Sequence, residues 1–101
     1  MTELTHAQAS GLADTMRTVA NPVRLQLMAM LSRRPGRQVD LLAGLQLGGT
    51  WISQSMLSHH LHRLTAAGLA SRERHGNVVT WRIEPAGLAL VADFLRKAGA
   101  R

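Results

Sequence analysis

The spacing of the apolar residues changes at Gly68, from a helical repeat to an alternating one. Before this glycine, three leucines recur at helical spacing within residues 53–67: Leu57, Leu61 and Leu64. After it, three large apolar residues alternate with their neighbours in residues 78–83: Val79, Trp81 and Ile83. The pattern predicts a helix that ends at Gly68 and a hairpin with one buried face. Because an isolated hairpin is only marginally stable in water, we expect it to pack on helices.

The chain has 101 residues, 46% of them apolar and 18% charged, which predicts one domain over residues 1–101 with one hydrophobic core. No apolar stretch approaches the roughly 20 residues of a membrane-spanning helix. Residues 1–10 lack the basic start and apolar segment of a secretion signal. We therefore expect a cytoplasmic protein. The sequence contains no cysteine, which excludes disulfides, thiolate metal sites and thiol redox chemistry.

Helix start and stop signals predict the remaining elements. Thr5 and Gln8 have the spacing of a capping box at the start of a first helix. Pro22 and Pro85 are each suited to the first turn of a helix. The expected helices are residues 5–20, 23–33, 39–45, 53–67 and 85–97, and the expected strands are 69–74 and 78–83 around a turn at 75–77. The fold class is mainly α with a small β-hairpin.

The helix at residues 53–67 has two different faces. Opposite the leucines lie small polar side chains and histidines: Ser55, Ser58, His59 and His62. A solvated helix usually carries Glu and Lys pairs, and this face has none. A helix about 10–12 Å across fits the major groove of DNA, and short polar side chains allow base edges to come close.

The charge balance also favours a polyanionic partner. Lys and Arg number 12 against six Asp and Glu, which gives a net charge of +6. The planar guanidinium suits phosphate and guanine recognition. The hairpin tip carries polar residues suited to a phosphate or a minor groove: Arg72, Arg74, His75 and Asn77. Three helices, a groove-fitting helix, a hairpin and a closing helix follow the order of a winged helix-turn-helix.

The last expected helix is more apolar than a surface helix should be. One stripe comprises Leu88, Val91, Ala92 and Leu95, and two further residues, Leu90 and Phe94, point elsewhere. A helix with two apolar faces at the end of a small domain usually covers a partner's surface. We therefore expect residues 85–98 to form half of a dimer interface, shared with residues 5–20.

Three segments resemble one known family. They are residues 20–25, ANPVRL; residues 53–64, SQSMLSHHLHRL, followed by 67–69, AGL; and residues 74–83, RHGNVVTWRI. Together they resemble the ArsR (arsenic-repressor-like) family of dimeric bacterial transcriptional regulators over residues 12–95. In the third segment Trp81 stands where the family commonly has tyrosine.

The resemblance implies a homodimer that binds an inverted-repeat operator, most often as a repressor. It assigns DNA contacts to the helix at 53–67 and to the wing at 72–82: Gln54, Ser55, Ser58, His59, His62, Arg63, Arg72, Arg74 and Asn77. The arginines would hold the DNA backbone, and the residues from Gln54 to His62 would face bases. It assigns the dimer interface to the first and last helices: Leu12, Met16, Leu88, Val91, Phe94 and Leu95.

The sequence departs from the family at its common metal sites. The third helix reads Val39-Asp40-Leu41-Leu42 where family sensors often carry a cysteine pair. The last helix offers only Asp93 and no histidine. We therefore expect neither a metal nor a cofactor. The alternative is a nickel- or zinc-responsive regulator that uses histidines such as His6, His59 or His62.

A second alternative is a winged-helix protein-interaction module with weak DNA binding. Trp51 and Met56 are the residues near the polar helix face that favour it. We expect instead that Trp51, in a loop at 47–52 that is longer than usual for the family, covers the core. His60, beside the leucines, should be a packed and hydrogen-bonded histidine. An enzyme is not expected, because the acidic residues are scattered and no phosphate loop is present.

Overall fold

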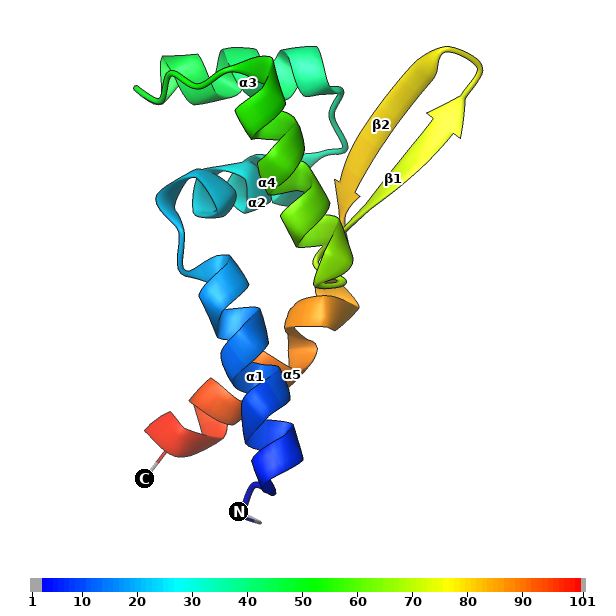
Figure 1. Cartoon of the computed structure of the whole chain (residues 1–101). Coiled ribbons are helices and arrows are strands. Elements are labelled where there is room, and N and C mark those ends of the chain that lie inside the picture. Colours follow the sequence, from blue (N-terminus) through cyan, green and yellow to red (C-terminus); the bar gives the residue numbers. More distant parts are fainter. Residues whose placement is uncertain (1–2, 101) are drawn as a thin grey trace.

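The computed structural model describes residues 3–100 (Figure 1). In this part of the chain the elements follow the predicted order of a winged helix-turn-helix, with a hairpin between the last two helices. The elements are α1 (His6–Val19), α2 (Pro22–Arg33), α3 (Gln38–Leu47), α4 (Gln54–Ala66), β1 (Ala70–His75), β2 (Val78–Ile83) and α5 (Pro85–Gly99). The expected fold class is confirmed.

The predicted capping box starts α1, and two further side chains cap α2 and α4. The Thr5 hydroxyl accepts a hydrogen bond from the Gln8 amide at 3.2 Å, and the Gln8 side chain accepts one from the Thr5 amide at 2.9 Å. This capping box satisfies amides that a first helical turn leaves without partners. Asn21 caps α2 in the same way, and Ser53 caps α4 by accepting from the Met56 amide at 3.0 Å.

Most predicted boundaries differ from the observed ones by one or two residues. Helix α3 begins one residue earlier than expected, at Gln38, and ends two residues later, at Leu47, directly before Gly48 and Gly49. Strand β1 includes His75, which pairs with Val78. The hairpin turn is therefore only two residues long, and its glycine, Gly76, has a positive φ of 62° that suits such a turn.

The core lies between α2, α3, α4 and the hairpin. Its fully buried or nearly buried side chains are mostly leucines: Leu27, Leu31, Leu41, Leu45, Leu57, Leu61, Leu64 and Leu69. Trp81 of β2 is 3% exposed and packs on this cluster, as the alternation of β2 predicted. Two backbone hydrogen bonds, of 2.9 and 2.8 Å, pair Trp81 with Gly36 and join the hairpin to the segment before α3.

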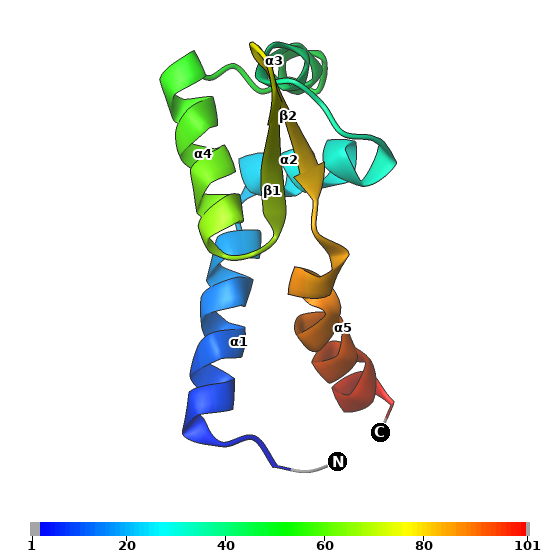
Figure 2. The ribbon, with the colours of Figure 1, turned by 90° about the vertical axis from the view of Figure 1, so that its right-hand side faces the viewer.

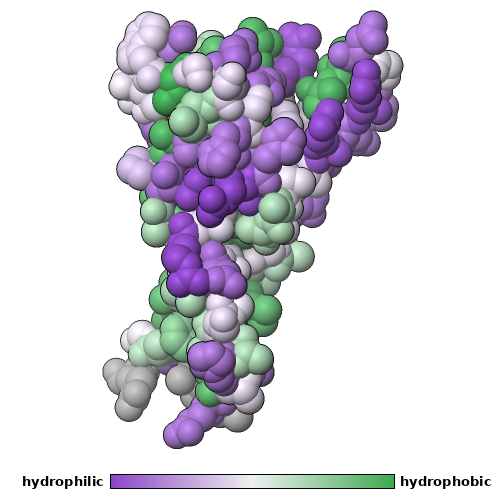
Figure 3. All heavy atoms as spheres, viewed as in Figure 1, coloured by the Kyte–Doolittle hydropathy of each residue, from purple (hydrophilic) through white to green (hydrophobic). Residues whose placement is uncertain are grey.

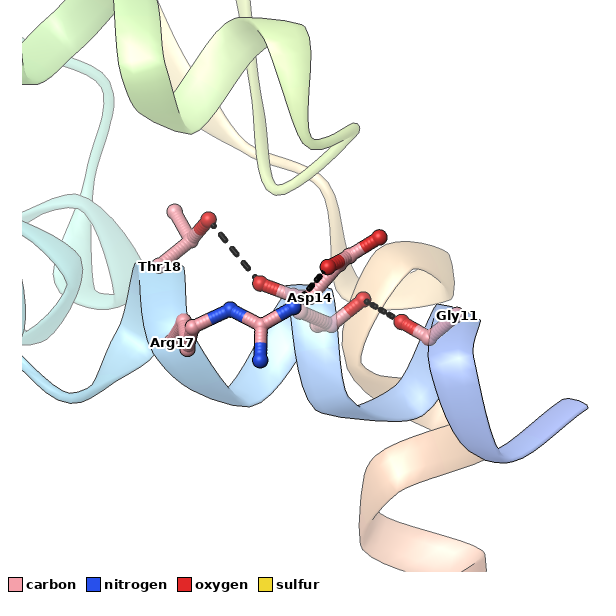
Figure 4. Close-up of polar contacts among 5 residues, drawn as sticks. Gly11, Asp14, Arg17 and Thr18 are labelled. Atoms are coloured by element: carbon pink, nitrogen blue, oxygen red, sulfur yellow. Dashed lines mark hydrogen bonds and ion pairs between the residues drawn. The ribbon is translucent and has the colours of Figure 1, made fainter. Parts of the chain in front are cut away.

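The helices α1 and α5 pack on each other at the other end of the molecule (Figures 1 and 2). The two ends of the chain lie there, far from the hairpin tip. Figure 4 shows polar contacts within α1, where Asp14 and Arg17 form an ion pair and the Thr18 hydroxyl donates to the Asp14 carbonyl. These contacts are local to α1, so they stabilise the helix without fixing α5.

The start of α5 lies against the corner between α4 and β1. Gly68, with a positive φ of 73°, ends α4 as predicted. Gly87 of α5 lies so close to it that a Cβ there would overlap the Gly68 carbonyl oxygen. A glycine at 87 is therefore required by this close approach. Within residues 3–100, no helix has the length and apolar character that crossing a bilayer requires.

Candidate nucleic-acid interface

Helix α4 separates a buried face from a polar face. Leu57, Leu61 and Leu64 are fully buried against the core. Ser55, His59 and His62, spaced four and three residues apart on the opposite side, are exposed. The structure therefore brings together the histidines and Ser55 that the sequence assigned to bases, and Gln54, also exposed, begins the helix.

The segment around α4 has no acidic residue. Between residues 41 and 72 the chain contains two arginines, three histidines and no Asp or Glu. In Figure 3 hydrophilic residues predominate around α4 and on the hairpin, with some hydrophobic residues among them, and the lower part, where α1 and α5 lie, is mixed. Residues 41–72 therefore present cations and no carboxylate to the phosphates of a nucleic acid, and the first acidic side chain after them is Glu73 on β1.

Gln38 holds the polar face of α4 in place, and the sequence interpretation missed it. Its Nε2 donates to the Ser58 hydroxyl at 2.7 Å and to the Gln54 carbonyl at 3.3 Å. Ser58 is consequently half-buried between α3 and α4, although its hydroxyl proton can still be donated. The predicted start of the third helix at Val39 left Gln38 outside the helix.

His62 connects α4 to the wing. Its Nδ1 donates to the Ser58 carbonyl at 2.7 Å, which leaves Nε2 of the neutral ring as an acceptor. The same ring meets Trp81 edge-on at 5.9 Å between centroids. The guanidinium of Arg72 lies over the Trp81 ring, 5.7 Å from its centroid. At this distance a cation–π attraction operates. Trp81 thus orients one predicted contact from α4 and one from the hairpin.

The remaining wing residues lie at or near the hairpin tip. Arg74 is exposed, and its Nε donates to the Gly76 carbonyl at 3.0 Å across the turn. Asn77 is exposed in the turn itself. Arg82, which the sequence interpretation did not single out, is exposed on β2, 3.4 Å from the Glu73 carboxylate. This ion pair is solvent-exposed and weak, so the Arg82 guanidinium remains available.

His60 is the packed histidine that the sequence predicted. It is 8% exposed, and its Nδ1 lies 3.2 Å from Nη1 of Arg24. Arg24 is buried as well and donates from Nε to the Thr18 carbonyl at 2.6 Å. Burial and then the charge of Arg24 lower the pKa of His60 below its usual value. The ring is therefore neutral at pH 7 and accepts the hydrogen bond from Arg24.

Arg63, the last predicted contact on α4, is exposed in the final turns of the helix. It lies near enough to Arg24 and His60 for its charge to lower the pKa of both. Its own guanidinium has no ion pair with a described carboxylate. An exposed cation that lies above a second cation, Arg24, favours an external anion.

The expectation that Trp51 covers the core was wrong. Its side chain is 75% exposed. Gly48 and Gly49 end α3, and the next residues turn inward at Thr50 and Ile52, which are half-buried. Trp51 lies between these two anchored residues, and its side chain is left outside.

The residues predicted at the dimer interface lie on α1 and α5. Three of them, Leu12, Val91 and Phe94, line a groove of about 390 Å³ between these helices, and Met16, Leu88 and Leu95 do not. Val91 is already buried within the single chain, Leu12, Met16, Leu88 and Phe94 are half-buried, and Leu95 is exposed. The expected stripe needs one correction, because Phe94 lies on the side of α5 that faces α1 whereas Ala92 and Leu95 face solvent.

No metal centre is formed by residues 3–100, since no three His, Asp or Glu side chains among them gather at ligand distance. His62 directs Nδ1 to a backbone carbonyl rather than toward another ligand. His6, the other histidine considered, is exposed at the first position of α1.

Comparisons with known proteins agree with this geometry. No protein-family model matches the chain. The HTH-type transcriptional regulator YgaV of Escherichia coli (strain K12) is 33% identical over 86 residues, which cover 83% of each chain. Among solved structures, a possible transcriptional regulator for arsenical resistance is 28% identical with a TM-score of 0.71. The alignment covers 83% of this chain and 82% of that regulator's chain. An ArsR family transcriptional regulator shares the fold with a TM-score of 0.77 at 21% identity, covering 99% of this chain and 94% of its own. The chain therefore belongs to the ArsR family of winged helix-turn-helix transcriptional regulators.

Proposed function

We propose that this regulator is a homodimer that binds an inverted-repeat operator and represses transcription. Helix α4 enters the major groove, and the wing at residues 72–82 follows the neighbouring backbone or minor groove. One observation carries the proposal: α4 exposes the polar side chains of Gln54, Ser55, His59 and His62, and residues 41–72 around them contain no acidic side chain.

The residues have two roles in this proposal. The first group faces base edges: Gln54, Ser55, Ser58, His59 and His62. Serine hydroxyls and histidine nitrogens both donate and accept, which suits the mixed donor and acceptor pattern of the major groove. The second group, Arg63, Arg72, Arg74 and Asn77, binds the sugar–phosphate backbone, because these residues are exposed and three of them are charged.

The dimer is proposed to form through α1 and α5. The groove between them is lined mainly by apolar side chains, among them Leu90, and both Leu90 and Leu95 are exposed on α5. The residues proposed at the interface are Leu12, Met16, Leu88, Val91, Phe94 and Leu95. A two-fold dimer binds two half-sites with the same α4 surface, which is why we expect an inverted repeat. A chromosomal regulator acts where the DNA lies, so a cytoplasmic location is part of the proposal.

Selection from a random duplex library, followed by binding measurements across a salt series, tests the proposal. We expect an enriched inverted repeat bound by one dimer. Affinity should fall steeply with salt, with a log–log slope of about −0.9 for each phosphate contacted. Strong salt-dependent binding without an enriched sequence would contradict sequence-specific regulation. The absence of duplex binding at low salt would contradict a DNA-binding role altogether.

A further inference from the structure

Trp51 is the large exposed aromatic residue next to the α4 surface. It lies in the loop between α3 and α4 and is 75% exposed, whereas Trp81 is 3% exposed. Tryptophan has the largest apolar area of the side chains and is rarely left in water unless it contacts something else. The exposed Trp51 side chain therefore requires a binding partner, because the single chain does not cover it.

The exposure of Trp51 does not result from a flexible loop between α3 and α4. The Thr50 amide donates to the Leu45 carbonyl at 2.8 Å, and its hydroxyl donates to Gln26 Oε1 on α2 at 2.7 Å. On the other side of Trp51, Ile52 packs on the core and Ser53 caps α4. The loop is therefore fixed on both sides of Trp51, and the side chain is held outward.

The surroundings of Trp51 point to DNA as the occupant. Trp51 precedes Ser55 by four residues, so their Cα atoms lie within about 14 Å of each other. The first residues of a recognition helix meet base edges, and the segment before them faces the sugar–phosphate backbone at the edge of the groove. No Asp or Glu occurs between residues 41 and 72 to repel a phosphate.

A protein partner fits this loop less well. Interfaces between proteins have a core of several large apolar side chains surrounded by a polar rim. From residue 47 to residue 66 the exposed large apolar side chains are Leu47, Trp51 and Met56, which are 92%, 75% and 46% exposed and belong to the end of α3, the loop and α4. Along the chain Trp51 has small residues on both sides, Gly48, Gly49 and Thr50 before it and Ser53 after it, and its other neighbour, Ile52, packs on the core. These small residues allow a backbone to approach, and they supply little apolar area.

We infer that Trp51 is a DNA-contact residue, whose ring packs on a deoxyribose at the groove edge while its Nε1–H donates to the adjacent phosphate. The inference rests on the proposed function and adds a residue to it. Indole suits this role because it has an apolar ring and a single donor, and the DNA backbone offers sugar carbons beside phosphate acceptors. The contact carries no sequence information, so Trp51 contributes equally to binding of every duplex.

Tryptophan fluorescence tests the contact directly, because the chain has only two tryptophans. Acrylamide quenching is measured on the full chain, free and with a saturating unlabelled duplex of random sequence at low salt. We expect the duplex to protect wild type from acrylamide. The matched control is Trp51→Phe, in which only the buried Trp81 emits, and its quenching should not change. The difference between the two proteins isolates Trp51 from any response of Trp81.

Affinity gives a second measurement, by anisotropy of a labelled random duplex and of the enriched duplex. Trp51→Ala should weaken binding to both by about tenfold, the effect of losing one hydrogen bond to a charged group. Trp51→Phe keeps a ring without the donor and should lie between Trp51→Ala and wild type. Leu25→Ala, which removes a 49%-exposed leucine on α2, is the control and should leave affinity unchanged.

The outcomes separate this inference from the proposed function. Duplex binding by wild type with unchanged acrylamide access to Trp51, or with equal affinity of Trp51→Ala, would overturn the contact and leave DNA binding intact. That result would assign Trp51 to a protein partner. Failure of wild type to bind any duplex at low salt would overturn the proposed function itself. Weakening confined to the enriched duplex would also overturn a backbone contact.

Discussion

The Nη1 of Arg24 donates across 3.2 Å to Nδ1 of His60 and so joins α2 to the buried side of α4. Its Nε donates to the Thr18 carbonyl near the end of α1. One guanidinium therefore holds three helices, and no carboxylate of residues 3–100 forms an ion pair with it. The position of the recognition helix depends on this neutral acceptor.

Replacing Arg24 with alanine should destabilise the protein by about 2–4 kcal/mol, because it leaves the Thr18 carbonyl and His60 Nδ1 without their buried donor. The measurement is the free energy of unfolding in urea at pH 7. The matched control is Arg17→Ala on α1, whose side chain is 69% exposed and whose loss should change stability by less than about 0.5 kcal/mol. Equal effects of the two substitutions would contradict the role of Arg24.

Stability should decrease as the pH falls below the pKa of an unfolded histidine, about 6.5. Burial and the charge of Arg24 keep the pKa of folded His60 below that value, so the unfolded chain binds a proton before the folded one does. The loss ends once the pH has passed through the folded pKa. One proton limits the slope from His60 to about 1.4 kcal/mol per pH unit.

Urea unfolding between pH 8 and pH 5 measures this dependence. His60→Gln should flatten the curve, because the amide oxygen can accept from Arg24 without titrating. His6→Gln, at the exposed start of α1, should leave the dependence due to His60 unchanged. A wild-type curve that His60→Gln does not flatten would show that other groups cause the loss.

Much of the fold followed from local patterns, because capping residues, leucine spacing and strand alternation all act over a few positions. His60 and Trp81 were placed correctly for this reason. Arg24 and Gln38 were missed as organising residues, since their partners lie 36 and 20 positions away and no local pattern reports them. Trp51 was placed wrongly because its type favours burial, while the anchoring of Thr50 turned its side chain outward.

Arg72→Ala should weaken binding to enriched and random duplexes alike. It should also reduce the magnitude of the slope of log affinity against log salt by about 0.9, the value for one phosphate contact. Arg72 is exposed on β1 and is oriented by Trp81. The measurement is anisotropy across a salt series. Arg96→Ala, which removes an exposed arginine of α5, is the control and should leave both quantities unchanged. A loss confined to the enriched duplex would mean that Arg72 faces a base.

Gln38→Ala should reduce discrimination between enriched and random duplexes more than it reduces stability. It removes the donor that holds Ser58 and the first turn of α4, and its cost in stability should be about 1 kcal/mol. The ratio of the two dissociation constants, with urea unfolding alongside, provides the measurement. Gln46→Ala changes the same residue type on α3 and serves as the control. An unchanged ratio would leave Gln38 with a purely structural role.

Gly87→Ala should destabilise the protein by at least about 2 kcal/mol, since the added methyl group overlaps the backbone of Gly68. Thermal unfolding measures the effect. Gly11→Ala on α1 meets nothing within 4 Å and should be neutral or stabilising, because alanine favours a helix interior. A Gly87→Ala protein as stable as wild type would mean that α5 can shift away from the corner at little cost.

The pairing of Gly36 with Trp81 fixes the base of the hairpin to the body of the domain. The base of β2 is bonded on both sides, to β1 and to the segment before α3, whereas the tip beyond Val79 is bonded only within the hairpin. The part of the hairpin beyond Val79 is therefore freer to bend than its base. The tip of the hairpin can follow DNA grooves of different width, while the base of the hairpin keeps a constant angle to the recognition helix.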